Sequence, residues 1–380
     1  MSHAPSLALS RRHRTVREAL ALRGLDALLI TALPNILYLT NFTGSSANLL
    51  VTADHLYFIT DFRYIETVSA MNGTAHHVPD LELVPVEGSY DATLAGFLTA
   101  RQWRRIGFEA AHMTVAHLGW LTATLAAADT PAPALVATDG LVEEARVRKD
   151  DYEIATLREA ARRLSAVATD VVTMARRGQT EQELAMAIDW RIRQAGFERS
   201  AFDTIVAAGP NSALPHARPG VRAIAEGDLV VLDFGGVYDS YCVDLTRTVS
   251  VGRAGSRARE VHAAVREARD RAIAAVAPGR SRFDIDAAAR DTLTAHGLGE
   301  AFGHGTGHGL GIEVHEDPRI TRRRPDVDAQ AEAVAPGMVF TIEPGAYLPG
   351  WGGVRIEDDV LVTEDGVDVL TDVTTELVEV

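Results

Sequence analysis

Four carboxylates in or beside apolar, strand-like runs constrain this chain of 380 residues more than any other feature. Asp233 lies in LVVLDFGG, Asp244 in YCVDLTRTV, Glu343 in FTIEPG and Glu357 in GVRIEDD. An ionised carboxylate among apolar residues is costly unless it is paired or bound to a metal ion. We therefore expect the fold to bring a compensating cation or a proton to these strands.

The two aspartates belong to runs that predict a β-hairpin. If 229–237 and 240–249 pair around a Tyr-Asp turn, Asp233 faces Asp244 directly, with Cβ atoms about 4.5–5.5 Å apart. Facing carboxylates repel, so they need a shared proton or a cation. Tyr-Asp is a poor two-residue turn, so two outward-facing polar residues on an edge hairpin remain the alternative.

A glycine-rich stretch carries two further candidates. His304 and His308 lie in GHGTGHGLG, which has five glycines in nine residues, and His315 follows in EVHED. Such a stretch is a poor helix, and its glycines allow a loop that presents imidazoles at a site. It is no phosphate loop, because no Lys-Ser/Thr pair follows the glycines. We interpret the cluster as functional, with satisfied structural histidines as the alternative.

One imidazole and four carboxylates form an oxygen-rich ligand set. Two ions that share bridging carboxylates would use all five ligands. Mn²⁺ suits this set best, and Co²⁺, Zn²⁺ or Fe²⁺ are also compatible. Arg355 precedes Glu357 by two residues and shares its strand face, so it forms either a plain ion pair or a contact that orients a ligating carboxylate.

The chain changes character near residue 140. Before it, helical patterns alternate with short apolar strands, which predicts an α/β domain with a central sheet over 1–140. The stretch 129–139 is rich in Pro and Ala and is interpreted as a boundary loop. Beyond it, helices mix with antiparallel hairpins, which predicts an α+β domain over 141–380. The strand and helix ranges that support this division are 27–30, 48–52, 56–61, 150–176, 181–195, 228–238, 241–251, 254–276, 282–295, 338–343 and 353–363.

Composition excludes several classes of function. A formal net charge of −15 argues against binding of nucleic acid, because a phosphate backbone would be repelled. The single cysteine, Cys242, cannot form an intramolecular disulfide and fits a reducing compartment, so we expect a cytoplasmic protein. No apolar run of about 18 residues predicts a membrane helix, and the first residues do not resemble a signal peptide.

The motifs resemble the pita-bread metallopeptidases, which include Xaa-Pro aminopeptidase, prolidase and methionine aminopeptidase, with creatinase as a metal-free relative. The resemblance implies a C-terminal pita-bread catalytic domain and a dinuclear centre whose ligands are Asp233, Asp244, His308, Glu343 and Glu357. All five ligands are present, which argues against the metal-free branch. His216, in LPHARPG, matches a histidine that contacts the substrate carbonyl, and His315 matches one across the scissile bond.

The N-terminal half resembles that of bacterial Xaa-Pro aminopeptidases, in YLTNFTGSSANLLVT and FITDFRY, although Asn41 replaces a usual glycine. The resemblance therefore implies an aminopeptidase that hydrolyses the X-Pro bond at a peptide N-terminus with a hydroxide bridging two metals. An Xaa-Pro dipeptidase (prolidase) is the alternative, followed by a metal-free relative or a non-catalytic binding protein. The resemblance also implies that the protein forms a homodimer or homotetramer.

The resemblance also suggests roles for individual side chains. Glu343 is expected to act as the general base, while His216 and His315 stabilise the oxyanion. Tyr241 is a candidate proton relay, with a packed sheet tyrosine as the alternative. His304 and Arg355 are expected to contact the substrate, and Arg355 is one candidate for binding a substrate carboxylate.

Overall fold

The computed structural model describes residues 3–323 and 332–380, and it divides into an N-terminal unit, Met1–Arg146, and a C-terminal unit, Val147–Val380. The division follows α6 (Leu141–Val147) instead of preceding it. The reason is that Arg146 Nη1 donates to Asn35 Oδ1 at 2.7 Å, which ties the end of α6 to the N-terminal unit.

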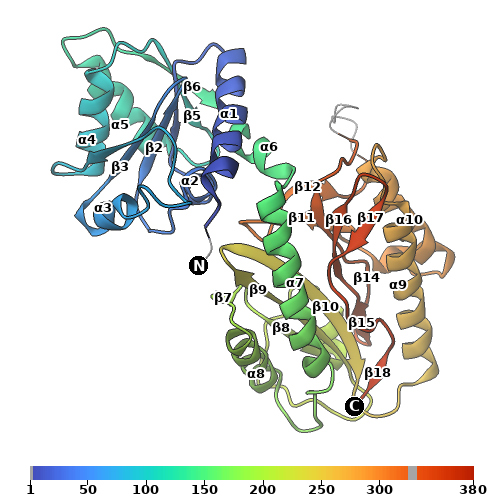
Figure 1. Cartoon of the computed structure of the whole chain (residues 1–380). Helices are drawn as coiled ribbons and strands as arrows, with labels where there is room; N and C mark the ends of the chain where they lie inside the picture. Colours follow the sequence, from blue (N-terminus) through green and yellow to red (C-terminus); the bar gives the residue numbers. More distant parts are fainter. Residues whose placement is uncertain (1–2, 324–331) are drawn as a thin grey trace. The chain divides into compact units, whose positions relative to one another are not determined.

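The N-terminal unit is a three-layer α/β structure (Figure 1). Its six strands lie in the order β4 (Leu81–Pro85), β3 (Leu56–Thr60), β2 (Asn48–Thr52), β1 (Ala27–Ile30), β5 (Arg105–Glu109) and β6 (Ala134–Thr138). Strands β1, β2 and β3 pair antiparallel, and the other neighbours pair parallel. Its helices are α1 (Ser6–Leu22), α2 (Leu33–Thr40), α3 (Phe62–Ser69), α4 (Tyr90–Thr99) and α5 (Val115–Ala126).

Two details of this unit depart from the sequence reading. The Pro- and Ala-rich stretch 129–139 is not simply a loop, because β6 within it pairs with β5 at the edge of the sheet. Asn41 ends α2 with φ of 60°, in the left-handed region. Asparagine tolerates that region better than other non-glycine residues, which explains why it can stand where glycine is usual.

The C-terminal unit contains two sheets and a separate hairpin. One sheet runs β18 (Val378–Glu379), β10 (Tyr241–Ser250), β9 (Leu229–Tyr238) and β7 (Arg199–Ser200), and β8 (Ile205–Ala208) also pairs with β9. The other runs β12 (Glu316–Ile320), β11 (Gly307–Gly309), β13 (Val339–Ile342), β16 (Asp358–Val362) and β17 (Val367–Val369), and the hairpin is β14 (Gly345–Leu348) with β15 (Gly352–Arg355).

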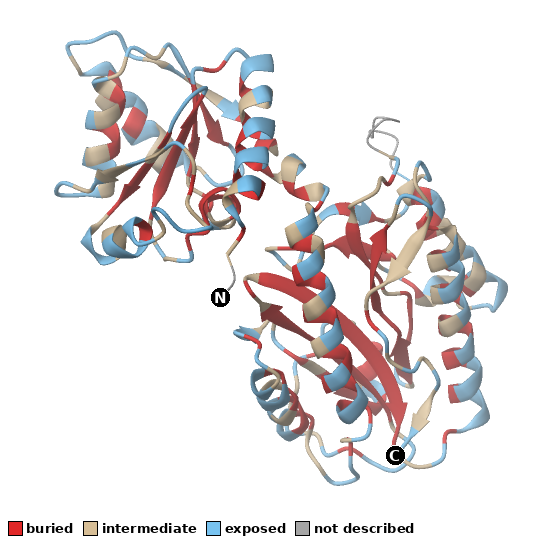
Figure 2. Cartoon of the chain, viewed as in Figure 1, coloured by how far each residue is buried: buried red, intermediate tan, exposed pale blue. Residues whose placement is uncertain are grey.

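Helices cover the outer sides of this sheet assembly (Figure 1). The long helices are α7 (Asp151–Val171), α8 (Glu181–Gln194), α9 (Ser256–Ala275) and α10 (Arg282–Ala295), and the short 3₁₀ turns are Gly209–Ala213 and Gly299–Ala301. One apolar cluster joins α7 and α8 to β9 and β10, and another joins α9 and α10 to β13 and β16. The inner strands β9, β10, β13 and β16 are buried, whereas the edge strands β7, β12, β17 and β18 are partly exposed, and the helices expose their outer faces (Figure 2).

The β9–β10 hairpin separates apolar from polar side chains by strand alternation. Leu232, Phe234 and Leu245 pack into the cluster with α7 and α8. Their neighbours Asp233 and Asp244 therefore point to the opposite face, toward the cavity described below.

The hairpin register differs from the predicted one. The turn lies at Asp239 and Ser240, which have φ of 49° and 69°, as a two-residue type I′ turn requires. Asp233 consequently pairs with Thr246, and Asp244 with Gly235. The prediction that the two aspartates oppose one another directly was wrong; they are diagonal neighbours on one face, still close enough to interact.

Within the described ranges 3–323 and 332–380, no helix is both long enough and apolar enough to span a bilayer.

Candidate metal centre

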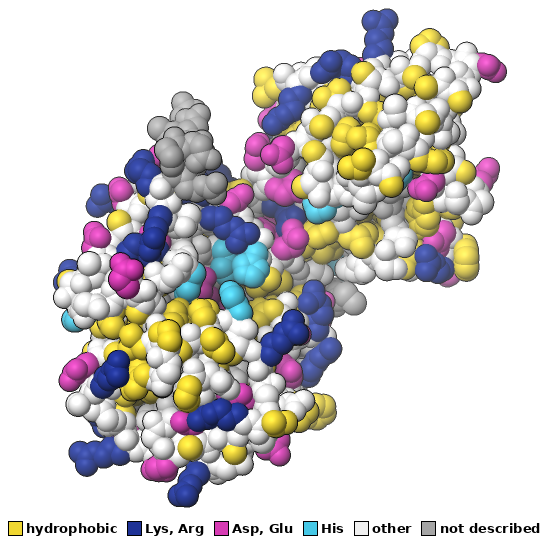
Figure 3. Space-filling view, turned by 180° about the vertical axis from the view of Figure 1, so that it is seen from behind, with side chains coloured by type: hydrophobic (Ala, Val, Ile, Leu, Met, Phe, Trp, Pro, Cys, Tyr) yellow, Lys and Arg dark blue, Asp and Glu magenta, His cyan; other side chains and the backbone are white. Residues whose placement is uncertain are grey.

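A cavity of about 570 Å³ in the C-terminal unit gathers nearly all the residues that the sequence singled out. Its lining includes Asp233, Asp244, His308, Glu343 and Glu357, together with His216, His304, His315 and Arg355. Figure 3 shows histidine side chains gathered on one face of this unit. Residues more than 100 positions apart in the chain thus meet at one surface opening.

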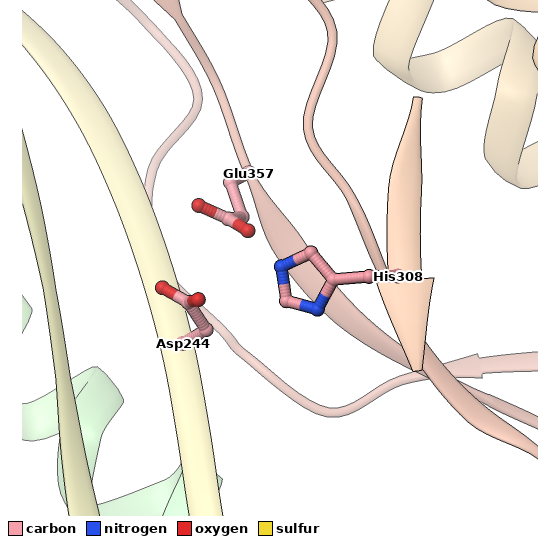
Figure 4. A group of neighbouring side chains, drawn as sticks. All are labelled: Asp244, His308 and Glu357. Atoms are coloured by element: carbon pink, nitrogen blue, oxygen red, sulfur yellow. The ribbon is translucent and has the colours of Figure 1, made fainter. Parts of the chain in front are cut away.

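Asp244, His308 and Glu357 form the tightest group. Their potential ligand atoms all lie within 4.8 Å of one another, and their side chains point toward a common point (Figure 4). They come from β10, β11 and the residue just before β16, so two sheets contribute. A β-bridge between Thr246 and Glu357 joins those sheets, and Thr246 Oγ1 donates to Glu357 Oε2 at 2.6 Å.

Arg355 holds the next carboxylate in place. Its Nη2 donates to Asp233 Oδ2, its Nε donates to Thr246 Oγ1 at 3.1 Å, and its Nη1 donates to Tyr347 Oη at 2.9 Å and to the Pro215 carbonyl at 3.2 Å. Arg355 as a whole is only 3% exposed, and each nitrogen of its guanidinium has a partner. Arg355 is therefore built to orient Asp233 and, through Thr246, Glu357, and it has little capacity left for a substrate carboxylate.

The protein around Asp244, Glu343 and Glu357 disfavours the ionised forms of these three acids. Burial first, and then the charge of Glu357, holds the pKa of Asp244 well above its usual range. Burial and the charge of Glu343 do the same to the pKa of Glu357. Burial raises the pKa of Glu343 to about 7, against the opposing effect of Arg355. Four carboxylates thus face one buried guanidinium, and they need further positive charge.

The donor atoms fit a metal ion. The Oδ1 atoms of Asp233 and Asp244 are buried and accept no hydrogen bond from any described residue. Such orphaned carboxylate oxygens are what a bound cation would use. His308 completes the set: its Nδ1 lies 3.1 Å from the Gly309 carbonyl, which assigns the proton to Nδ1 and leaves the Nε2 lone pair free.

Burial also keeps the imidazole in its ligating form. It lowers the pKa of His308 to about 3, with a smaller contribution from His315, so the ring is neutral at physiological pH. Its Nε2 lies 3.7 Å from Glu343 Oε1. Oxygen ligands with one imidazole and no thiolate favour Mn²⁺ and related divalent ions.

Comparison with known proteins identifies the family. Residues 155–364 match the family model for metallopeptidase family M24, and residues 12–148 match the model of the creatinase/prolidase N-terminal domain. The chain belongs to metallopeptidase family M24.

Relatives of this M24 chain cover almost its whole length. An uncharacterised peptidase of Bacillus subtilis is 38% identical over 93% of this chain and 96% of its own. An Xaa-Pro dipeptidase structure from Bacillus anthracis has a TM-score of 0.90 at 36% identity, covering 98% of this chain and 100% of that one. An X-Pro aminopeptidase structure from Thermotoga maritima has a TM-score of 0.84 at 32% identity, covering 96% and 100%. The two-domain pita-bread fold is thereby confirmed.

His216 and His315 lie at the exposed lining of the M24 cavity. The ring centroid of His315 is 4.3 Å from that of His308. Partial desolvation, then the charge of Arg319, lowers the pKa of His315. His216 lies on a loop whose two ends are bound by one buried carboxylate: Glu181 accepts from Ala208 N at 2.8 Å and from Gly220 N at 3.2 Å.

His304 also lines the cavity, but other protein groups engage both of its ring nitrogens. Nδ1 lies 2.8 Å from the Gly305 carbonyl, and Nε2 lies 2.9 Å from Tyr347 Oη. Burial lowers the pKa of His304 to about 4. Tyr347, which links His304 to Arg355, was missed by the sequence analysis, although it follows Glu343 by only four residues.

Tyr241 is not brought to the site. It lies on the opposite face of β10 from Asp244, inside the apolar cluster with α7. Its hydroxyl donates to Glu153 Oε1 at 3.2 Å, and its ring meets Tyr152 edge-on. The parity of the strand separates the two faces, so the proposed proton relay is replaced by the packed tyrosine that was its alternative.

Two arginines on the cavity lining were not predicted. Arg218 and Arg319 both line it, and neither makes an ion pair with a described residue. The charge of Arg319 affects the pKa of His308, His315 and Glu343, so this guanidinium lies within electrostatic reach of the centre. Arg319 belongs to β12, four residues after His315.

Proposed function

We propose that this metallopeptidase hydrolyses Xaa-Pro bonds with two divalent ions, Mn²⁺ for preference and otherwise Co²⁺, Zn²⁺ or Fe²⁺. The ions would be held by Asp233, Asp244, His308, Glu343 and Glu357. The observation that carries the proposal is the convergence of four carboxylates and one neutral imidazole on a cavity with a single buried compensating cation. The Xaa-Pro substrate is suggested by the dipeptidase and aminopeptidase structures that the chain resembles.

When bound, two such ions lower the pKa of a water molecule and polarise the carbonyl of the scissile bond. The chain's own residues would do the rest. His216 and His315 donate hydrogen bonds to the carbonyl oxygen as it gains negative charge. Glu343 accepts the proton released by the water and passes it to the proline nitrogen. That nitrogen carries no hydrogen in an X-Pro bond, so it must be protonated before it leaves.

The length of the substrate is the second part of the proposal. The sequence favoured an aminopeptidase, and suggested Arg355 as a contact for a free proline carboxylate. In the structure Arg355 is committed to Asp233, whereas Arg319 is an exposed guanidinium of the cavity lining without an ion-pair partner among the described residues. A dipeptide has a free carboxylate next to its scissile bond, so we propose that X-Pro dipeptides are the preferred substrates.

The test compares Ala-Pro with Ala-Pro-Ala, using metal-stripped protein reloaded with Mn²⁺. We expect faster cleavage of the dipeptide, and we expect Arg319→Met to raise its KM by about tenfold or more while the tripeptide changes little. Arg218→Met is the matched control and should affect both substrates alike. Faster tripeptide cleavage that Arg319→Met does not alter would establish the aminopeptidase instead. If metal-loaded protein cleaves neither, the Xaa-Pro function is rejected.

The homodimer or homotetramer and the cytoplasmic location stay predictions of the sequence. Ultracentrifugation of the purified chain tests the first.

A further inference from the structure

Lys149 is unique in this chain. Of its 37 lysines and arginines, Lys149 is the only lysine. It is also buried: its side chain is 1% exposed, and its Nζ lies 3.0 Å from Oε2 of Glu316, whose side chain is 7% exposed. A chain that otherwise uses arginine at every cationic position thus has its one compact ammonium group inside a buried ion pair. A planar guanidinium differs in size and geometry, so the two cations are not interchangeable in such a place.

The backbone on the lysine side is rigidly fixed. Lys149 N donates to the Gly337 carbonyl at 2.8 Å. The next residue, Asp150, caps α7 and forms a reciprocal capping box with Glu153. Lys149 therefore projects from an anchored point of the C-terminal unit.

Glu316 connects that anchor to the loop that carries His315. Its Oε1 accepts from Glu313 N at 3.0 Å, while its Oε2 accepts from Lys149 Nζ at 3.0 Å. The carboxylate is pressed against Gly311, where a Cβ atom would come within 2.9 Å of Oε2. One carboxylate thus binds the loop 311–316 internally and also to Lys149.

His315 depends on this loop for its position. Its ring contacts His308, but no residue of 3–323 or 332–380 makes a hydrogen bond to it. A side chain without a hydrogen-bonded neighbour is oriented mainly by the position of its own backbone. The backbone of His315 is continuous with that of Glu316, so the contacts of Glu316 help to fix it.

We propose that Lys149 is a positioning residue, which fixes His315 at the cavity through its buried ion pair with Glu316. The inference rests on the proposed function, in which His315 stabilises the developing oxyanion. A purely structural ion pair is the competing account, and the following experiments separate the two.

The first experiment measures kcat, KM and Mn²⁺ content of Lys149→Met, Lys149→Arg and the control Arg163→Met. Arg163 lies on α7, is half-buried and pairs with Glu159, but it does not line the cavity. We expect both Lys149 variants to lose kcat by about tenfold or more, with Mn²⁺ content unchanged and KM little affected. Arg163→Met should retain the wild-type kcat. Full kcat in Lys149→Met, which removes the ion pair, would overturn the proposal.

A double-mutant cycle with His315→Ala is the more specific readout. If Lys149 acts through His315, then Lys149→Met should reduce kcat less than twofold in the His315→Ala background, because the two changes remove one shared contribution. An equal reduction in both backgrounds would mean that the ion pair is merely structural.

A double variant, Lys149→Met with Glu316→Gln, controls for misfolding. It leaves no unpaired buried charge, so its free energy of unfolding should recover relative to that of Lys149→Met alone. We expect no such recovery of kcat, because the tether to the loop is still missing. If the double variant recovered kcat as well as stability, the positioning role would be contradicted.

Hydrogen exchange of the Glu313 amide gives a readout that needs no substrate. In Mn²⁺-loaded protein we expect exchange at least about tenfold faster in Lys149→Met than in wild type or Arg163→Met, because the acceptor of that amide is released. Unchanged protection would overturn the inference even if wild-type protein cleaves no Xaa-Pro substrate. Failure of the proposed function therefore remains distinguishable from failure of the positioning role.

Discussion

Two neighbouring acids, Glu357 and Asp358, lie in opposite environments. Asp358 Oδ1 accepts from Arg247 Nη2 at 2.8 Å and from Thr371 Oγ1 at 2.7 Å, and its Oδ2 accepts from Arg269 Nε at 2.8 Å. Glu357 faces the cavity, where Thr246 Oγ1 donates to it and its charged neighbours include other acids. Both side chains are buried, yet one is fully compensated by the protein and the other is not.

The difference shows that the number of compensating cations separates a structural buried carboxylate from one that can bind a ligand. Two guanidiniums, those of Arg247 and Arg269, pair with Asp358, which makes it part of the packing between α9 and the sheet. Around Asp244 and Glu357 the protein supplies too few cations, and burial raises the pKa of both acids. An uncompensated cluster of this kind costs stability unless a ligand neutralises it, so the shortage of cations supports the proposed metal centre.

Asp358→Asn should have the largest effect on stability. It leaves the buried Arg247 and the half-buried Arg269 opposite a neutral group, and breaking a buried ion pair in this way costs about 3–5 kcal/mol. Urea unfolding of metal-free protein measures it. Asp244→Asn, measured beside it, should be as stable as wild type or more so, because it removes a repelling charge. An equal loss of stability in Asp358→Asn and Asp244→Asn would contradict the distinction between compensated and uncompensated acids.

Asp244→Asn should instead abolish function. Removing a ligand should lower kcat/KM by at least about a hundredfold, which corresponds to about 2.7 kcal/mol of transition-state stabilisation. The Mn²⁺ content should fall with it, and circular dichroism should confirm an unchanged fold. Full metal content with full activity would remove Asp244 from the ligand set.

Glu181→Gln should have an intermediate effect, through the loop that carries His216. The buried carboxylate accepts from Ala208 N, Gly220 N and Asn211 Nδ2, and an amide presents hydrogen atoms to one of these donors. We expect kcat to fall by about tenfold with Mn²⁺ retained. The control Glu183→Gln, on the exposed side of the same helix, should leave kcat unchanged. Similar kinetics for both variants would show that the loop needs no such support.

The pH dependence of stability is the smallest expected effect. Glu343 has its pKa raised from 4.5 to about 7, so between these values the folded state binds a proton that the unfolded state lacks. The buried His304 and His308 act in the opposite direction, because burial lowers their pKa values to about 4 and about 3 while the unfolded chain still binds their protons near pH 6.5. Glu343→Gln contains the same histidines and therefore serves as the reference. Relative to Glu343→Gln, the stability of metal-free wild-type protein should therefore fall as pH rises from 4.5 to 7 and level off above 7, by at most about 1.4 kcal/mol per pH unit for this group.

Metal ions that replace this proton should remove the decline. Thermal unfolding of the metal-free and Mn²⁺-loaded forms at pH 6, 6.5 and 7, each measured beside Glu343→Gln, compares the two forms. A decline of the same size in both forms would mean that Glu343 is not at the metal centre.

The sequence pointed to the four cavity carboxylates and the one imidazole, because each carboxylate lies in or beside an apolar run and the imidazole lies in a glycine-rich loop. The sequence did not predict features that depend on the turn, the strand face or contacts between distant segments. The hairpin register depended on two turn residues with positive φ, and Tyr241 was misassigned because strand parity places it behind the site. Arg355 and Arg319 look alike in the sequence. Only the fold shows that Asp233, Tyr347 and Pro215 occupy the first, while the second is left without an ion-pair partner among the described residues.

The central claim is that the uncompensated acids hold two metal ions. Calorimetric titration of metal-stripped protein with Mn²⁺, followed by electron paramagnetic resonance of the loaded sample, tests it most directly. The account predicts two ions per chain with the spectrum of a coupled pair, and a loss of that coupling in Asp244→Asn. Saturation with no ion or one ion, or two uncoupled ions that persist in Asp244→Asn, would contradict it.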